Sequence, residues 1–216
     1  MLHENAFESG SLFDTELVTD PSAMIQESVD DFWRQHLYTA SPLFVNYALN
    51  HRFTSEELIS LLKRKMNQPF LRIVPEKEAP ETEPQEKRFR EAFSRTLKAW
   101  SVSKDEVAHL LISCEGLNRG QYPVSKLGIW LKDMEDLFTY GENAPGLFPG
   151  FKKFCRAELA AGTRKGFDPP KHRFFDCCED LQRASRDLES VFALRLLGLK
   201  VKLFKEAGGE LSRRKI

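Results

Sequence analysis

His172, Cys177 and Cys178, with Cys155 further upstream, form the densest group of potential metal ligands in the sequence. Structural zinc sites usually take their ligands as two pairs, with roughly two to four residues inside each pair. That spacing is absent here, because two of the thiols are adjacent and the other two ligands stand alone. We therefore expect no metal site, and we interpret the cysteines as small apolar residues near the start of a helix.

The sequence also lacks the common catalytic and nucleotide-binding motifs. It contains no G-x-S-x-G turn, no P-loop, no dinucleotide-binding glycine pattern and no pair of histidines four residues apart. It has one Glu-x-x-His pair, Glu106 with His109, whereas ferritin-like sites need two. We expect no cofactor and favour a non-enzymatic role. An enzyme that uses His172 and the neighbouring thiols is the last of three hypotheses.

Basic residues alternate with phenylalanines between residues 148 and 175. Such a mixture can bind nucleic acid by combining charge with stacking on bases. The same mixture is also typical of a helical core with a solvated outer face, and both interpretations stay open. The candidate nucleic-acid-binding residues of this segment are Lys152, Lys153, Arg156, Arg164, Lys165, Lys171 and Arg173.

The elements that position these residues include a central pair of helices. Ser103 and Glu106 have the spacing of a capping box, which predicts that a helix starts there. Gly116 and Gly120 flank a turn, and Pro123 suits the first turn of a second helix. The second helix is expected to carry one apolar stripe, formed by Val124, Leu127, Leu131, Met134 and Phe138.

Residues 103–134 thus have the outline of a helix-turn-helix motif, which would place Arg119, Gln121, Ser125 and Lys126 against DNA. Residues 102–111 followed by residues 124–127 resemble bacterial helix-turn-helix regulators and some antitoxins, and this resemblance implies a DNA-binding transcriptional regulator. The alternative is an antiparallel helix pair that forms half of a core. The long turn favours this alternative, because such motifs usually have turns of about 3–4 residues.

The composition is that of a globular protein. Its 216 residues are 41% hydrophobic and 30% charged, which is enough for one domain or two small ones. The formal net charge of zero argues against a surface devoted entirely to nucleic acid. The charges are nevertheless unevenly distributed, since no Lys or Arg precedes Trp33 whereas basic residues dominate 152–173. This asymmetry can steer a partner toward one end of the molecule.

Helix signals follow one another along most of the chain. Asp20, Ser41 and Thr54 are candidate caps for three early helices, and Phe70–Val74 is the one segment with the pattern of a strand. A short helix is expected at about 151–161 and a long final helix from near Asp176, ending at Gly208. These signals predict an all-α helical bundle of about seven or eight helices.

Composition shifts suggest a division of the chain into five parts. We predict an acidic arm at 1–19, an N-terminal helical lobe at 20–74, an acidic, proline-containing linker at 75–86, a C-terminal helical lobe at 87–209 and a basic tail at 210–216. A single domain remains the alternative to two lobes.

No apolar run is long enough to cross a bilayer, and the first residues lack the pattern of a secretory signal. Four cysteines without a disulfide framework predict reduced thiols and a cytoplasmic location. The leading hypothesis is a non-enzymatic helical subunit of a larger assembly that binds a protein partner, with an association with nucleic-acid machinery. A helix-turn-helix regulator is the second hypothesis.

Overall fold

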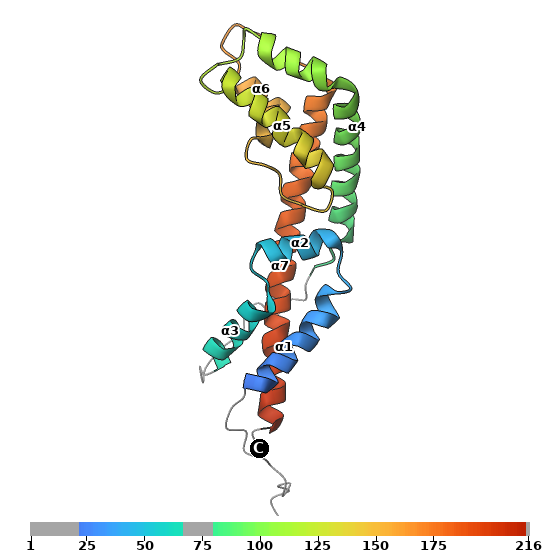
Figure 1. Ribbon diagram of the computed structural model, residues 1–216, viewed down its shortest axis with the longest axis vertical. Helices are drawn as coiled ribbons and strands as arrows, with labels where there is room; N and C mark the ends of the chain where they lie inside the picture. The colour runs from blue at the N-terminus through green and yellow to red at the C-terminus, as the bar shows by residue number, and fades with distance from the viewer. Residues whose placement is uncertain (1–21, 67–79, 215–216) are drawn as a thin grey trace, which may run out of the picture. The chain divides into compact units, whose positions relative to one another are not determined.

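The computed structural model describes residues 22–66 and 80–214 of the chain. Within these residues the all-α prediction is confirmed, because they form seven α-helices, one short 3-10 helix and no strand (Figure 1). None of the described helices is long and apolar enough to cross a membrane. The predicted acidic arm at 1–19 and the predicted strand at Phe70–Val74 lie outside the described residues.

The helices belong to two compact units. Unit 1 takes its described residues from 22–40, 48–66 and 196–214, and unit 2 takes them from 41–47 and 80–195. Helices α2 (Pro42–Asn50) and α7 (Arg173–Arg214) contribute residues to both units. Residues 75–79 of the predicted linker lie outside the described residues, and residues 83–86 belong to the next helix, α4. The predicted lobes stay a prediction.

Unit 1 is built on α1 (Ser22–Leu37), α3 (Ser55–Met66) and the last part of α7. α1 packs against α3, and the ring of Trp33 stacks on that of Phe53 with centroids 5.9 Å apart. The buried side chains of α1 recur at helical spacing and face the interior of this unit. They are Ile25, Val29, Phe32 and Leu37.

The predicted caps of α2 and α3 are confirmed. Ser41 Oγ accepts a hydrogen bond from the backbone N–H of Phe44 at 3.2 Å, and Thr54 Oγ1 accepts one from Glu57 at 3.3 Å. In both cases a side-chain oxygen satisfies a backbone donor that the helix itself leaves unpaired.

The predicted helix start at Ser103 is wrong, because α4 (Glu83–Ser113) is one helix of 31 residues that passes through it. Ser103 lies inside the helix, where its Oγ donates to the carbonyl of Ala99 at 2.5 Å. The buried face runs from Trp100, before this point, to Val107 and Leu111 after it. The capping-box pattern therefore marks a serine whose hydroxyl bonds back to its own helix. Such bonds often bend a helix, and Figure 1 shows α4 changing direction along its length.

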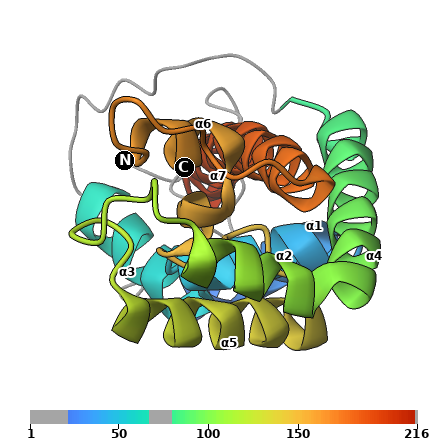
Figure 2. The ribbon, with the colours of Figure 1, turned by 90° about the horizontal axis from the view of Figure 1, so that it is seen from above.

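Helix α5 (Val124–Tyr140) starts as predicted after Pro123, and Figure 2 shows it alongside the part of α4 that precedes the turn. The predicted stripe holds for Leu127 and Met134, which are buried, but not for Val124, which is 57% exposed. Leu131 and Phe138 of the stripe are half-buried, and Leu137 is buried beside them.

The last predicted elements are shifted in the structure. The expected helix at 151–161 is a 3-10 helix, η1 (Phe151–Phe154), followed by α6 (Arg156–Ala161). Helix α7 starts at Arg173, before the predicted Asp176, and continues beyond Gly208 to Arg214. A glycine inside a helix costs only about 1 kcal/mol. Burial of Leu199 and Leu203 on the same helix offsets that cost.

Candidate nucleic-acid interface

His172 is fixed between the start of α7 and the side of α4. Its Nδ1 accepts a hydrogen bond from the backbone N–H of Phe174 at 3.0 Å, so the imidazole caps the N-terminus of α7. Its Nε2 lies 3.6 Å from Oε2 of Glu106 on α4. Because Nδ1 accepts, the neutral ring carries its proton on Nε2, on the side that faces α4.

One side of His172 opens into a hollow between α4 and α7, which we call the basic hollow. Its volume is about 490 Å³. Three permanent cations and His172 surround it, against a single carboxylate, that of Glu106. The residues that line the basic hollow are Arg95, Lys98, Ala99, Val102, Ser103, Glu106, His172, Arg173 and Cys177.

The other side of His172 opens into a second hollow, which we call the proline hollow. Its volume is about 470 Å³, and most of its wall is apolar. Its one carboxylate, that of Asp176, is paired with Arg156 at 3.0 Å. The residues that line the proline hollow are Arg156, Ala157, Ala160, Pro169, Pro170, Lys171, His172, Phe175 and Asp176.

Four cations around these hollows have no partner among the described residues. Arg95, Lys98, Lys171 and Arg173 are all exposed, and none of them forms an ion pair or a side-chain hydrogen bond within residues 22–66 and 80–214. Cations that the protein does not neutralise itself are available to an anionic ligand. The arrangement therefore fits a polyanion such as a sugar–phosphate backbone.

Three of the seven basic residues predicted between 148 and 175 come together here. Arg156 and Lys171 line the proline hollow, and Arg173 lines the basic hollow. Four of the six phenylalanines of the segment serve the core, because Phe151, Phe154, Phe174 and Phe175 are buried, whereas Phe167 is 49% exposed.

The other four basic residues of the segment lie elsewhere. Lys153 pairs with Glu158 at 2.6 Å, and Arg164 donates to the carbonyl of Glu115. Lys152 lines a separate hollow beside Phe148, and Lys165 is exposed in the loop after α6.

Arg119, Gln121, Ser125 and Lys126 lie at the turn between α4 and α5. The Arg119 guanidinium donates to the carbonyls of Leu111 at 3.0 Å, Ile112 at 2.6 Å and Cys114 at 3.0 Å, and so satisfies the end of α4. Gln121, Ser125 and Lys126 are exposed. Contact between these four residues and DNA stays a prediction.

Helix α4 contributes a set of residues to the site that was not predicted from the sequence. Arg95, Lys98, Val102 and Glu106 follow one another at steps of three and four residues, so they share one face of that helix. This spacing was readable from the sequence. The packing of that face against the start of α7 could not be predicted from the spacing, because it depends on tertiary structure.

The thiols near His172 lack the properties of a nucleophile. Burial raises the pKa of Cys155 to about 12 and raises that of Cys178 as well. Burial also raises the pKa of Cys177, although Arg173 and Arg95 oppose the shift. Reactive cysteines instead have a lowered pKa. In the described part of the chain, no three His, Cys, Asp or Glu side chains are grouped so that they could hold a metal ion.

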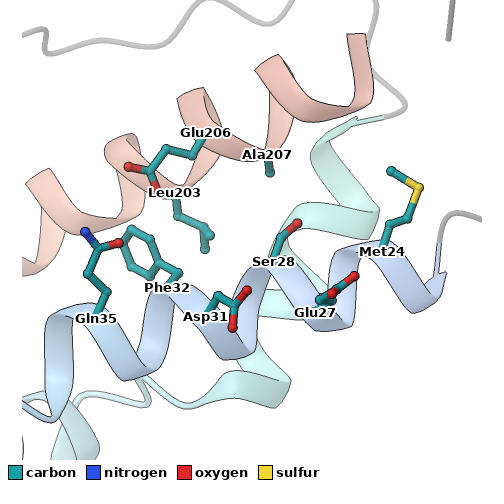
Figure 3. Close-up of a pocket in the computed structure, with 9 residues that line it drawn as sticks. All are labelled: Met24, Glu27, Ser28, Asp31, Phe32, Gln35, Leu203, Glu206 and Ala207. Carbon is teal, nitrogen blue, oxygen red and sulfur yellow. The ribbon is translucent and has the colours of Figure 1, made fainter. Parts of the chain in front are cut away.

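Unit 1 has a groove of the opposite charge, between α1 and the last part of α7, which we call the acidic groove (Figure 3). Its volume is about 330 Å³. Phe32, Leu203 and Ala207 are buried at its base. Glu27 and Asp31 are exposed along it, and Asp31 is paired with Arg34 at 2.8 Å. Carboxylates repel phosphates, so this groove does not suit nucleic acid.

No protein-family model matches the chain. It is 26% identical over 218 residues to the RecBCD enzyme subunit RecB of Escherichia coli K12, an alignment that covers 98% of this chain and 18% of that protein. It is 27% identical over 147 residues to the RecB subunit of Haemophilus influenzae Rd, covering 61% of this chain and 12% of that protein. The chain thus spans less than a fifth of the length of these relatives, and its similarity to them is weak.

Proposed function

We propose that the chain is a non-catalytic helical module of a RecBCD-like assembly that works on DNA, and that the basic hollow holds the sugar–phosphate backbone. The observation that carries this proposal is the group of unpaired cations around His172. Similarity to RecB along almost the whole chain supports the assignment to such an assembly.

The geometry of the basic hollow suits a backbone rather than a compact ligand. Arg95 and Lys98 lie one helical turn apart on α4, and Arg173 approaches from α7, so the positive charge is spread along the hollow. Each Lys or Arg that neutralises a phosphate releases condensed counterions, and this release favours binding at low salt. Backbone contacts of this kind position a protein on nucleic acid without reading its sequence.

The proposal is tested by measuring the fluorescence anisotropy of labelled oligonucleotides over a range of salt concentrations. The double variant Arg95→Ala, Lys98→Ala should bind more weakly. The slope of log affinity against log salt is negative, and its magnitude should decrease by roughly 1.5. Lys132→Ala is the matched control, because Lys132 is exposed on α5 and lines neither hollow. Equal losses in the double variant and the control, or no binding by the unmodified chain, would contradict the proposal.

A module of this kind also needs a protein partner, for which the acidic groove of unit 1 is the candidate. Its buried base and its carboxylates complement a helix with one apolar face and Lys or Arg beside it. We propose a basic amphipathic helix of a partner subunit as the occupant. The four cysteines are free thiols, which supports a cytoplasmic setting for the assembly.

The other two hypotheses have less support. A helix-turn-helix regulator requires a helix start near Ser103, where α4 is continuous. It also requires a free Arg119, which is bonded to three carbonyls. An enzyme based on His172 and the thiols requires a thiolate, whereas burial holds the nearby cysteines in the neutral form.

A further inference from the structure

We infer that the proline hollow takes up an unstacked nucleobase, so that the interface binds single-stranded nucleic acid more tightly than duplex. This inference rests on the proposed function, because it assigns the class of nucleic acid to the same site. The observations behind it are the apolar wall of the proline hollow and its position directly beside the basic hollow.

Much of the wall of the proline hollow is formed by apolar side chains. Pro169, Pro170, Ala157 and Ala160 present carbon atoms to the hollow, and Phe175 beneath them is 1% exposed. A phosphate gains little from these carbon atoms, although Lys171 also lines the hollow, whereas the face of a base can lie against apolar side chains. With a volume of about 470 Å³ the hollow has room for a planar ring.

The basic hollow and the proline hollow adjoin each other at His172. His172 lines both of them, and its neighbours in the chain, Lys171 and Arg173, line one hollow each. A nucleotide whose phosphate lies in the basic hollow therefore has its base within reach of the proline hollow. The two parts of one nucleotide would meet the two kinds of surface that they need.

The walls of the proline hollow are joined to one another by polar bonds. Helix α6 is tied to α7 by the ion pair of Arg156 with Asp176 and by the backbone N–H of Ala157, which donates to Glu179 Oε2 at 3.0 Å. The opposite wall is held by the cap that His172 forms on α7. A hollow held by such bonds costs little further ordering when a ligand enters it.

Duplex nucleic acid cannot use this hollow without first losing a base pair. Its bases are paired and stacked inside the helix, and turning one outward costs a few kcal/mol. A single strand presents its bases without that cost, so the proline hollow discriminates in its favour.

The experiment compares three labelled probes of equal length on the full chain, at one low salt concentration. They are a single strand, the same strand with its bases replaced by abasic sites, and a duplex. The single strand should bind about tenfold more tightly than the abasic strand, because one stacked base is lost. It should also bind more tightly than the duplex.

A matched pair of variants locates the base. Ala160→Leu fills part of the proline hollow, whereas Ala161→Leu adds the same side chain to the next exposed position of α6, outside the lining. The first variant should lower single-strand affinity to the abasic level and leave abasic affinity unchanged. The second should match the unmodified chain. Thermal unfolding of both variants checks that each is folded.

The outcomes separate this inference from the proposed function. Equal affinity for the single strand and the abasic strand, or tighter binding of duplex, would overturn the base-binding hollow and leave backbone binding intact. Equal effects of the two leucine variants would overturn its location. Failure of all three probes to bind would overturn the proposed function together with the inference.

Discussion

Tyr122 shows how a single residue organises the loops beside the candidate interface. Its side chain is fully buried, its ring lies edge-on to that of Trp130 with centroids 6.1 Å apart, and Lys153 Nζ lies 5.0 Å from its centroid. The backbone beside it is held by a hydrogen bond from Asn118 N to Gly162 O at 2.9 Å. The loop after α6 therefore packs on the turn between α4 and α5 through this ring and through backbone hydrogen bonds, which include one from Arg164 N to Gly116 O at 2.8 Å.

The glycine at 162 is required by that ring. A Cβ added there would lie 2.4 Å from Cε2 of Tyr122, so Gly162→Ala should lower the free energy of unfolding by about 1–3 kcal/mol. Gly128→Ala is the control, because a Cβ on that helical glycine meets no atom within 4 Å. It should raise stability by about 0.5–1 kcal/mol. Urea denaturation measures both, and a stable Gly162→Ala would contradict the packing described.

Cys155 predicts a pH dependence of stability. Burial raises the pKa of its thiol from 9.0 to about 12, so the folded chain holds this proton more tightly than the unfolded chain. The free energy of unfolding should therefore be fully maintained below about pH 9 and fall as the pH rises toward 12. Cys155→Ser removes the titrating group and should flatten this fall. The remaining slope includes contributions from Cys177, Cys178, Tyr122 and Tyr47, whose pKa values burial also raises. Urea denaturation at several pH values tests the difference, and an unchanged slope in the variant would contradict it.

At the scale of elements, the sequence predicted helix starts well where the signal is local. The oxygens of Ser41 and Thr54 cap α2 and α3 as their positions in the sequence indicate. The same kind of signal failed at Ser103, because a serine inside a helix can bond to the carbonyl four residues earlier. Gly208 and Gly209 did not end α7, because a cost of about 1 kcal/mol for each glycine is small in a helix of 42 residues.

The candidate site was only partly predictable for the same reason. Arg156, Lys171 and Arg173 were found because basic residues recur in one segment of the chain. Arg95 and Lys98 were missed because their role depends on the packing of α4 beside the start of α7. Such a pairing is a long-range contact that periodicity within a single helix does not encode.

The start of α7 gives a prediction about His172. Because its Nδ1 caps the helix, His172→Ala should lower the free energy of unfolding by about 1 kcal/mol. His172→Asn offers a side-chain oxygen at the same position and should recover most of that loss. Thermal unfolding compares the two variants. Equal stability of the alanine and asparagine variants would show that the imidazole acts through packing and not as a cap.

At the scale of the whole molecule, a net charge of zero hides two surfaces of opposite sign. The basic hollow belongs to unit 2 and the acidic groove belongs to unit 1. Net charge alone would argue against nucleic-acid binding, whereas the local distribution supports it. The proposed function needs both surfaces, because one would hold the nucleic acid and the other a protein partner.

Substitutions in one surface should therefore weaken binding of its own ligand and leave binding at the other surface unchanged. Glu27→Lys with Asp31→Lys reverses the acidic groove and should weaken binding of a synthetic helical peptide that has leucines on one face and lysines beside them. The same double variant should keep its affinity for oligonucleotides, whereas Arg95→Ala with Lys98→Ala should show the reverse pattern. Fluorescence anisotropy of labelled peptide and labelled oligonucleotide measures all four combinations. A peptide with glutamate in place of lysine is the control for charge, since carboxylates along the groove should repel it. If either double variant weakened both ligands equally while remaining folded, one shared surface would have to bind both, and the division of roles between the units would be wrong.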